Sequence, residues 1–310
     1  SISLNPRLKR LLFLICLNGG ALGLECILQR IYYGDYRGKL LFLIEPSVNS
    51  LNLAHFGPFA YRSNAASYLN LIWPLCLGLL IQLGHENLDQ KKLRIGNNPE
   101  LLIIPCIIIA ASGPFISSAR GGTFVMVGLF ILANVSIIFL KVRSVFIRLL
   151  ALITLFAGLG AAYHLGWDKL EPRLMDIYSD NMSGRTKIYE VTYKMIDDYG
   201  LFGSGPGTFE AVAQFELGGA FTTWSSWVHN DYLEFYLTFG KPGVAILIAL
   251  TVTLALQCLA TFLRDSTQSL KWYCLISVVG VMIHAILDFP IQVYSILTLL
   301  VLIIPAIFEL

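Results

Sequence analysis

Charged residues are scarce in this 310-residue sequence. Asp, Glu, Lys and Arg make up 14% of it, whereas soluble globular domains average about 25%. This scarcity argues against an ordinary soluble domain, and it accompanies 56% hydrophobic residues and a mean hydropathy of +0.68. The net charge of +2 is too small, and the basic residues too dispersed, for a nucleic-acid partner. The composition therefore predicts a polytopic membrane protein.

The sequence also lacks motifs for metals and nucleotides. It contains no C-x-x-C, H-E-x-x-H or G-x-S-x-G pattern, and its five histidines are scattered. The glycine-rich segment 203–207, GSGPG, lacks the Lys and Ser/Thr of a phosphate-binding loop and suits a close approach of two backbones instead. We expect no metal and no cofactor.

The cysteines lie in or beside apolar runs and are expected to be packing residues. They are Cys16, Cys26, Cys76, Cys106, Cys258 and Cys274.

Long apolar windows, by contrast, recur along the chain. A spanning helix needs about 20 apolar residues, and about eight windows approach that length. They are residues 9–28, 65–83, 101–118, 122–140, 146–164, 242–263, 270–287 and 290–308. We therefore predict an all-α polytopic membrane protein with about eight transmembrane helices, in which backbone polar groups are satisfied inside each helix.

The Lys and Arg residues of the connecting segments gather on one side if the windows alternate in direction. The positive-inside rule makes that side cytoplasmic. The outer side, periplasmic in a bacterium, then carries one long segment, which is expected to be functional because of its length. We expect transmembrane helices 1–5 in residues 1–164, a large, partly helical periplasmic catalytic loop in residues 165–241, and transmembrane helices 6–8 in residues 242–310.

Within this long segment, residues 185–198 show the periodicity of an amphipathic helix. The apolar face is formed by Ile188, Tyr189, Thr192, Met195 and Ile196. Asn181 or Ser183 is expected to cap the helix, and Gly200 is expected to end it. Such a helix, with aromatic residues after it, suggests an element that lies at the membrane interface.

One histidine lies where the long segment enters the next apolar window. His229 precedes Asn230, a candidate orienting partner, and the acids Asp231 and Glu234. Histidine titrates near physiological pH and is a common acid or base. A catalytic histidine fits this position, and so does a histidine that only hydrogen-bonds water at the headgroup boundary.

Arg120 lies between two apolar windows in ISSARGGTF. A guanidinium so close to the membrane is costly unless it is paired, and the glycines and helix start that follow it offer N–H donors suited to phosphate. The alternative is an arginine that only snorkels to the interface, although it would then lie on the side where positive charge is disfavoured.

Other polar residues mark the outer ends of the apolar windows. Arg185 opens the amphipathic helix and could be an ordinary solvated charge, as could Arg173. Arg62 and Asn64 lie at the outer end of the second window. Asp288 lies at the outer end of the seventh window. A carboxylate at this depth needs a cavity or a cation, so we expect Asp288 to pair with one of the arginines.

Together these motifs resemble the O-antigen ligase family of bacterial membrane glycosyltransferases, which includes lipopolysaccharide ligases, Wzy-type polysaccharide polymerases and protein O-oligosaccharyltransferases. His229 and Asn230, nine further residues, and then Gly240 and Gly243 are similar to the family signature H-N-x9-G-x-x-G. Supporting motifs are SARGG, SGRTKIY, DYGLFGSGPGTF, YRSNAASYL and DFPIQ. Tyr189 stands where the family often has tryptophan. Larger members have about a dozen spans, so we expect that N-terminal helices precede this chain in a longer protein.

The resemblance implies a GT-C-like membrane enzyme of the bacterial inner membrane. It would transfer a glycan from a polyprenyl-diphosphate donor to an acceptor hydroxyl of a glycan, lipid or protein at the outer face, without a metal and with inversion of the anomeric centre. His229 is the implied general base, with Asn230 fixing the local geometry, and Arg120 and Arg185 are the implied diphosphate ligands. The implied supporting residues are Asp288, Gly240, Gly243, Arg62 and Asn64.

Two other functions remain open. A polysaccharide or lipid-carrier transporter, or flippase, would use broken helices and polar groups near the bilayer midplane, whereas the candidates here gather on one face. A non-catalytic assembly component that retains the fold is the third possibility.

Overall fold

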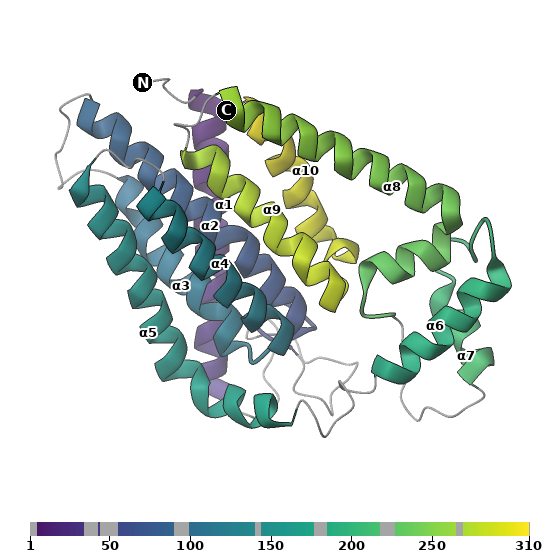
Figure 1. The fold of residues 1–310 in the computed structure, drawn as a ribbon. Coiled ribbons are helices and arrows are strands. Elements are labelled where there is room, and N and C mark those ends of the chain that lie inside the picture. The colour runs from purple at the N-terminus through teal and green to yellow at the C-terminus, as the bar shows by residue number, and fades with distance from the viewer. Residues whose placement is uncertain are drawn as a thin grey trace.

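The structure, a computed structural model, describes residues 5–33, 43, 55–89, 99–139, 144–176, 185–217, 227–264 and 269–309 (Figure 1). Its α-helices are α1 (Pro6–Tyr33), α2 (Arg62–Asp89), α3 (Ile103–Ile116), α4 (Arg120–Phe139), α5 (Val145–Met175), α6 (Arg185–Tyr199), α7 (Phe209–Leu217), α8 (Asp231–Arg264), α9 (Ser269–Leu287) and α10 (Tyr294–Glu309). Two 3-10 turns, η2 (Pro99–Leu102) and η3 (Pro290–Gln292), join them. These ranges hold one isolated bridge, between Phe56 and Phe59, and no strand, which confirms the all-helical prediction for this part of the chain.

Six helices are long and apolar enough to cross a membrane: α1, α2, α4, α5, α8 and α9. Two more apolar helices, α3 and α10, contain 14 and 16 residues. Each predicted window overlaps one of these eight helices, although the windows at 101–118 and 290–308 also include the turns η2 and η3. The chain is thus a multi-pass membrane protein with six candidate spans.

Helix α2 is the buried centre of the bundle and packs against α1, α3, α4 and α9 (Figure 1). Glycines allow α1 to approach it closely. A Cβ on Gly19 would lie 2.5 Å from the side chain of Ile72 in α2. Gly20 allows a similar approach to α3, where its Cβ would lie 2.4 Å from Cys106 Sγ. Small residues at helix contacts are the usual means of packing in lipid, where no hydrophobic effect drives helices together. Five cysteines are buried as predicted, while the side chain of Cys258 lies outside the described part.

Beside the bundle, α6, α7, residues 227–230 and the first turns of α8 form a smaller unit, here called the outer unit (Figure 1). Its core consists of Ile188, Met195, Phe209, Ala213, Val228 and Leu237. Helix α6 matches the predicted amphipathic helix and ends at Gly200, whose φ is +56°. The predicted caps Asn181 and Ser183 lie outside the described residues. Helix α5 continues to Met175, beyond the expected boundary at 164.

A kink divides α8 at Gly240, where φ is 61° and ψ is −163°. Only glycine commonly adopts this conformation. The glycine-rich segment crosses the helix here: Ser204 N donates to Leu237 O at 2.8 Å, and Lys241 N donates to Leu201 O at 3.0 Å. A Cβ on Gly240 would lie 2.2 Å from Leu201 O. The predicted close approach of two backbones is confirmed, and it fastens the segment after α6 to α8 at the kink.

Candidate active site

Several helix ends meet at one end of the bundle, where α2, α4, α6 and α8 begin and α9 ends. Ser63 Oγ, in the first turn of α2, lies 3.1 Å from His284 Nε2 in the last turn of α9. A Cβ on Gly121, in the first turn of α4, would lie 3.4 Å from Leu287 Cβ. Arg185, the first residue of α6, donates a hydrogen bond to the Leu287 carbonyl. Each contact brings a helix start to the same end of α9.

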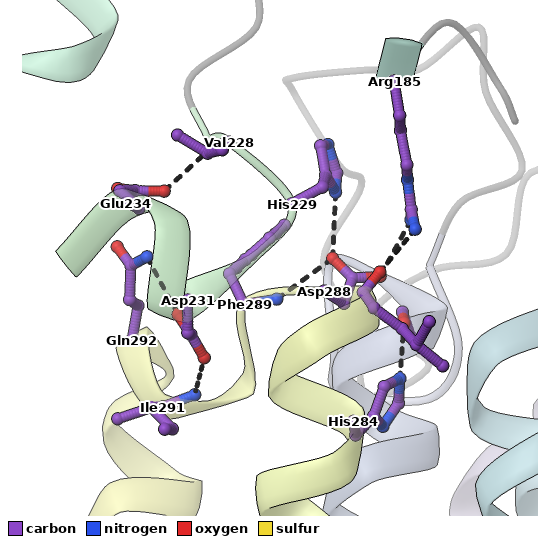
Figure 2. Close-up of polar contacts among 12 residues, drawn as sticks. Arg185, Val228, His229, Asp231, Glu234, His284, Asp288, Phe289, Ile291 and Gln292 are labelled. Atoms are coloured by element: carbon purple, nitrogen blue, oxygen red, sulfur yellow. Dashed lines mark hydrogen bonds and ion pairs between the residues drawn. The ribbon is translucent and has the colours of Figure 1, made fainter. Parts of the chain in front are cut away.

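Asp288, directly after α9, joins the histidine and one arginine (Figure 2). His229 Nδ1 lies 2.9 Å from Asp288 Oδ1, and Arg185 Nη2 lies 3.2 Å from Asp288 Oδ2. Oδ1 also accepts from Phe289 N at 3.2 Å. The arginine that pairs with Asp288 is therefore Arg185. No hydrogen bond to His229 Nε2 occurs among the described residues, so this nitrogen can face a substrate.

The electrostatics of this cluster keep its acid and its arginine charged. Burial alone would raise the pKa of Asp288, but the hydrogen bond from His229 and the charge of Arg185 lower it to about 2. Burial alone would lower the pKa of Arg185, but the Asp288 carboxylate and Tyr61 raise it. The pKa of Tyr61 is raised to about 12 by burial and by the charge of Asp288, so its phenol is neutral at pH 7.

The backbone of His229 is in the left-handed region, with φ at +60°. Non-glycine residues rarely adopt it, and such strain persists where surrounding contacts hold the chain. Here Tyr189 Oη donates to His229 O at 3.1 Å. Asn230 Oδ1 accepts from Leu233 N at 3.0 Å and so caps α8. The imidazole is thus oriented by Asp288, while Asn230 fixes the start of the helix that follows.

Asp231 fastens the start of α8 to the turn that carries Asp288 (Figure 2). Its carboxylate accepts from Ile291 N at 2.8 Å and from Gln292 Nε2 at 3.0 Å. Its own backbone N donates to Asp288 O at 3.2 Å. Two segments far apart in the sequence are therefore held in a fixed relation, and the histidine and aspartate with them.

The other residues predicted for the site lie at the start of α2, at the start of α4 and at the kink of α8. Arg120 opens α4, and Arg62 and Asn64 lie in the first turn of α2. The charge of Arg120 acts on Arg62, so the two arginines lie within electrostatic range of each other. Gly240 and Gly243 lie at the kink of α8, where a Cβ on Gly243 would be 2.3 Å from Phe239 Cβ. Both glycines therefore lie where α8 bends.

Aromatic residues beside His229 were not predicted as part of the site. The rings of Tyr61 and Phe289 lie edge-on to the imidazole, with centroids at 5.9 Å and 5.1 Å. Both residues adjoin predicted ones, since Tyr61 precedes Arg62 and Phe289 follows Asp288. Adjacency was the only signal available in the sequence. No group of three His, Cys, Asp or Glu side chains that could hold a metal occurs in the described ranges.

The fold and this cluster define a multi-pass helical membrane protein with a histidine–aspartate pair and an arginine at one end of its bundle. Residues 105–248 match the family model described as O-antigen ligase. The match includes Arg120, Arg185 and His229 and ends before Asp288. No curated protein and no solved structure matches the chain. The family domain implies a glycan-transferring enzyme that acts on lipid-linked glycans.

Proposed function

We propose that the protein transfers a glycan from a polyprenyl-diphosphate donor to an acceptor hydroxyl at the outer face of the bacterial inner membrane. The observation that carries this proposal is the contact of His229 Nδ1 with Asp288 at a site where three helices begin with an arginine. Such a site offers a base and an anion-binding surface side by side, which is what transfer from a diphosphate requires.

In this proposal His229 is the general base. Asp288 accepts the hydrogen bond from Nδ1–H, which fixes the tautomer and leaves Nε2 to take the proton of the acceptor hydroxyl. The aspartate stays ionised at neutral pH and stabilises the imidazolium that forms. The deprotonated hydroxyl attacks the anomeric carbon, the bond to the diphosphate breaks, and direct displacement inverts the anomeric centre.

The leaving diphosphate would lie among the helix starts. Helices α2, α4 and α6 begin with Arg62, Arg120 and Arg185, so three guanidinium groups accompany three helix N-termini with partial positive charge. Arg185 uses part of its fork on Asp288 and Leu287, and its remaining N–H groups can donate to phosphate. Arg120 and Arg185 are the diphosphate ligands in this proposal, and Arg62 and Asn64 support them.

The membrane arrangement in this proposal has eight crossings. Helices α3 and α10 cross with the six longer ones. Helix α3 joins the end of α2 to the start of α4 at the opposite end of the bundle, and α10 runs from the turn after α9 back to the end where α9 begins (Figure 1). The three regions are residues 1–164, the catalytic loop at 165–241, and residues 242–310. The end with the site faces the periplasm, and the opposite end, where the described Arg7, Lys9 and Lys271 lie, faces the cytoplasm.

A lipid-carrier flippase is the competing function. Such a transporter needs its substrate groups near the midplane between two repeats. The histidine, aspartate and arginines here lie at helix ends instead. This placement favours chemistry at one face over transport across the bilayer.

The test is the reaction of purified protein in liposomes with a polyprenyl-diphosphate glycan from the source cells and their envelope acceptor fraction. The wild type should release polyprenyl diphosphate. Arg120→Ala and Arg185→Ala should raise the donor KM about tenfold or more, whereas Arg7→Ala, at the opposite end, should not. Movement of intact donor across the bilayer without cleavage would support the flippase instead. A wild-type donor KM in both arginine variants would reject the diphosphate site.

A further inference from the structure

Three aromatic rings form a continuous stack next to His229. Tyr61 and Phe289 are parallel within 7°, with centroids 5.6 Å apart. Phe289 and Trp227 are parallel within 16°, with centroids 5.0 Å apart. Phe289 thus stacks on both other rings, and its position beside His229 and Asp288 is seen in Figure 2. The stack joins the residue before α2, the turn after α9 and the segment before α8.

The two ends of the stack have different surroundings. Tyr61 directly precedes Arg62, and its hydroxyl interacts with Arg185, so this end adjoins the arginines. Phe289, in the middle, is 6% exposed, whereas Trp227 is 38% exposed although Phe289 covers one face of its ring. Trp227 is thus the exposed member of the stack, and Tyr61 is the member beside Arg185.

The position of Trp227 is fixed by the residue after it. Val228 is fully buried in the core of the outer unit, and its backbone N donates to Glu234 Oε2 at 2.9 Å (Figure 2). The carboxylate of Glu234 is itself buried in the first turns of α8. An exposed indole held in place by buried neighbours is a preorganised surface, which loses little entropy when a ligand binds.

We propose that Trp227 is a binding platform for a pyranose ring of the acceptor, which makes the acceptor a carbohydrate. The inference rests on the proposed transferase function. The face of an aromatic ring carries partial negative charge and attracts the polarised C–H groups on the apolar face of a sugar. The sugar rim carries hydroxyl groups, and Trp227 is two residues from His229, whose Nε2 would take the proton of one of them.

The donor sugar is a poorer fit for this platform. The donor is anchored through its diphosphate, which the arginines hold at the Tyr61 end of the stack. The acceptor has to approach the anomeric carbon from the side opposite the leaving group in an inverting displacement. Trp227 contacts the cluster through Phe289, whereas Tyr61 contacts Arg185, so the exposed indole suits the acceptor better than the donor.

The experiment compares Trp227→Ala and Trp227→Phe with wild type, using as acceptor the oligosaccharide released by mild acid from envelope glycolipids of the source cells. Trp227→Ala should raise the acceptor KM about tenfold while the donor KM stays within twofold. Trp227→Phe keeps an aromatic face and should recover most of the loss. Tyr193→Ala, which removes an exposed ring from the same outer unit, is the matched control and should leave both constants unchanged.

Failure of this inference is distinguishable from failure of the proposed function. Suppose that wild type transfers the glycan. The platform is rejected, and the transferase stands, if Trp227→Ala changes neither KM or only the donor KM. The same holds if transfer goes only to protein hydroxyls. If wild type transfers nothing, titration of tryptophan fluorescence with the same oligosaccharide tests the platform alone. Saturable quenching that is lost in Trp227→Phe supports it, and equal curves for the two proteins reject it.

Discussion

The helical bundle and the outer unit are held together by different means. The bundle has one large apolar core around α2, and its helices approach through glycines that contact neighbouring side chains. The outer unit has a small core of six buried residues, and backbone hydrogen bonds at the Gly203–Gly240 crossing fasten its glycine-rich segment to the kink of α8. The bundle is therefore stabilised by packing, whereas the outer unit depends on a few directional contacts.

The candidate site lies where these two regions meet. The bundle contributes Asp288, Tyr61 and Phe289, while the outer unit contributes Arg185 and His229. Neither region carries both the base and the carboxylate that orients it. Changes that loosen the attachment of the outer unit should therefore abolish transfer while the bundle remains folded.

The largest such effect is expected from Gly240→Ala. The new Cβ would lie 2.2 Å from Leu201 O, and the backbone conformation is one that alanine avoids. The two crossing segments must separate, which displaces His229 from Asp288. Displacement by about 1 Å can lower a rate by roughly 100-fold. We expect such a loss in the transfer assay, with faster proteolysis near residues 200–208 and an unchanged helical content.

Gly200→Ala is the matched control for this change. Gly200 also has a positive φ, at +56°, but nothing lies within 4 Å of its added Cβ. It should cost only about 1 kcal/mol of local stability and leave transfer nearly intact. Equal losses in the two variants would show that backbone strain, and not the crossing, is responsible.

A smaller effect is expected from Asp231→Ala, which removes the link between α8 and the turn after α9. Ile291 N and the Gln292 amide lose their acceptor, and a buried donor without a partner costs about 1–3 kcal/mol. The kcat should fall about tenfold with little change in either KM, because the change acts on the alignment of the pair. Asp231→Asn should recover part of the rate.

The control is Asp198→Ala, which removes an exposed carboxylate from α6 and should have no effect. A purely structural role would lower the melting temperature while kcat per folded molecule stays normal.

The smallest effect concerns stability at low pH. The folded-state pKa of Asp288 is lowered from 3.8 to about 2, so its contribution to stability is fully present above about pH 4 and disappears as pH falls towards 2. A shift of this size corresponds to about 2 kcal/mol. Between pH 5 and 3 the melting temperature of wild type should therefore fall more steeply than that of Asp288→Asn in the same detergent. Parallel curves would show that Asp288 is not held as a carboxylate by Arg185 and His229.

Local features of this structure could be predicted from the sequence, and long-range ones could not. The apolar windows and the amphipathic face of α6 follow from residue spacing along one segment, and the structure has helices at each. The use of glycine at 203–207 for a close backbone approach was also predictable. These features depend on neighbours within a few residues of one another.

The pairing of Asp288 with both His229 and Arg185 needed the folded chain, since the aspartate is 59 and 103 positions away from them. The sequence offered Asn230 as the orienting partner, but Asn230 caps α8 and Asp288 holds the ring. The stack of Tyr61, Phe289 and Trp227 likewise joins three distant segments. No periodicity within one segment encodes such contacts.

The most direct test of the central claim is transfer by His229→Ala in liposomes that contain the polyprenyl-diphosphate glycan and the envelope acceptor fraction. The variant should elute and unfold like wild type, bind the donor with an unchanged affinity, and release polyprenyl diphosphate no faster than protein-free liposomes. Release at the wild-type rate by this folded variant would contradict the assignment of His229 as the base.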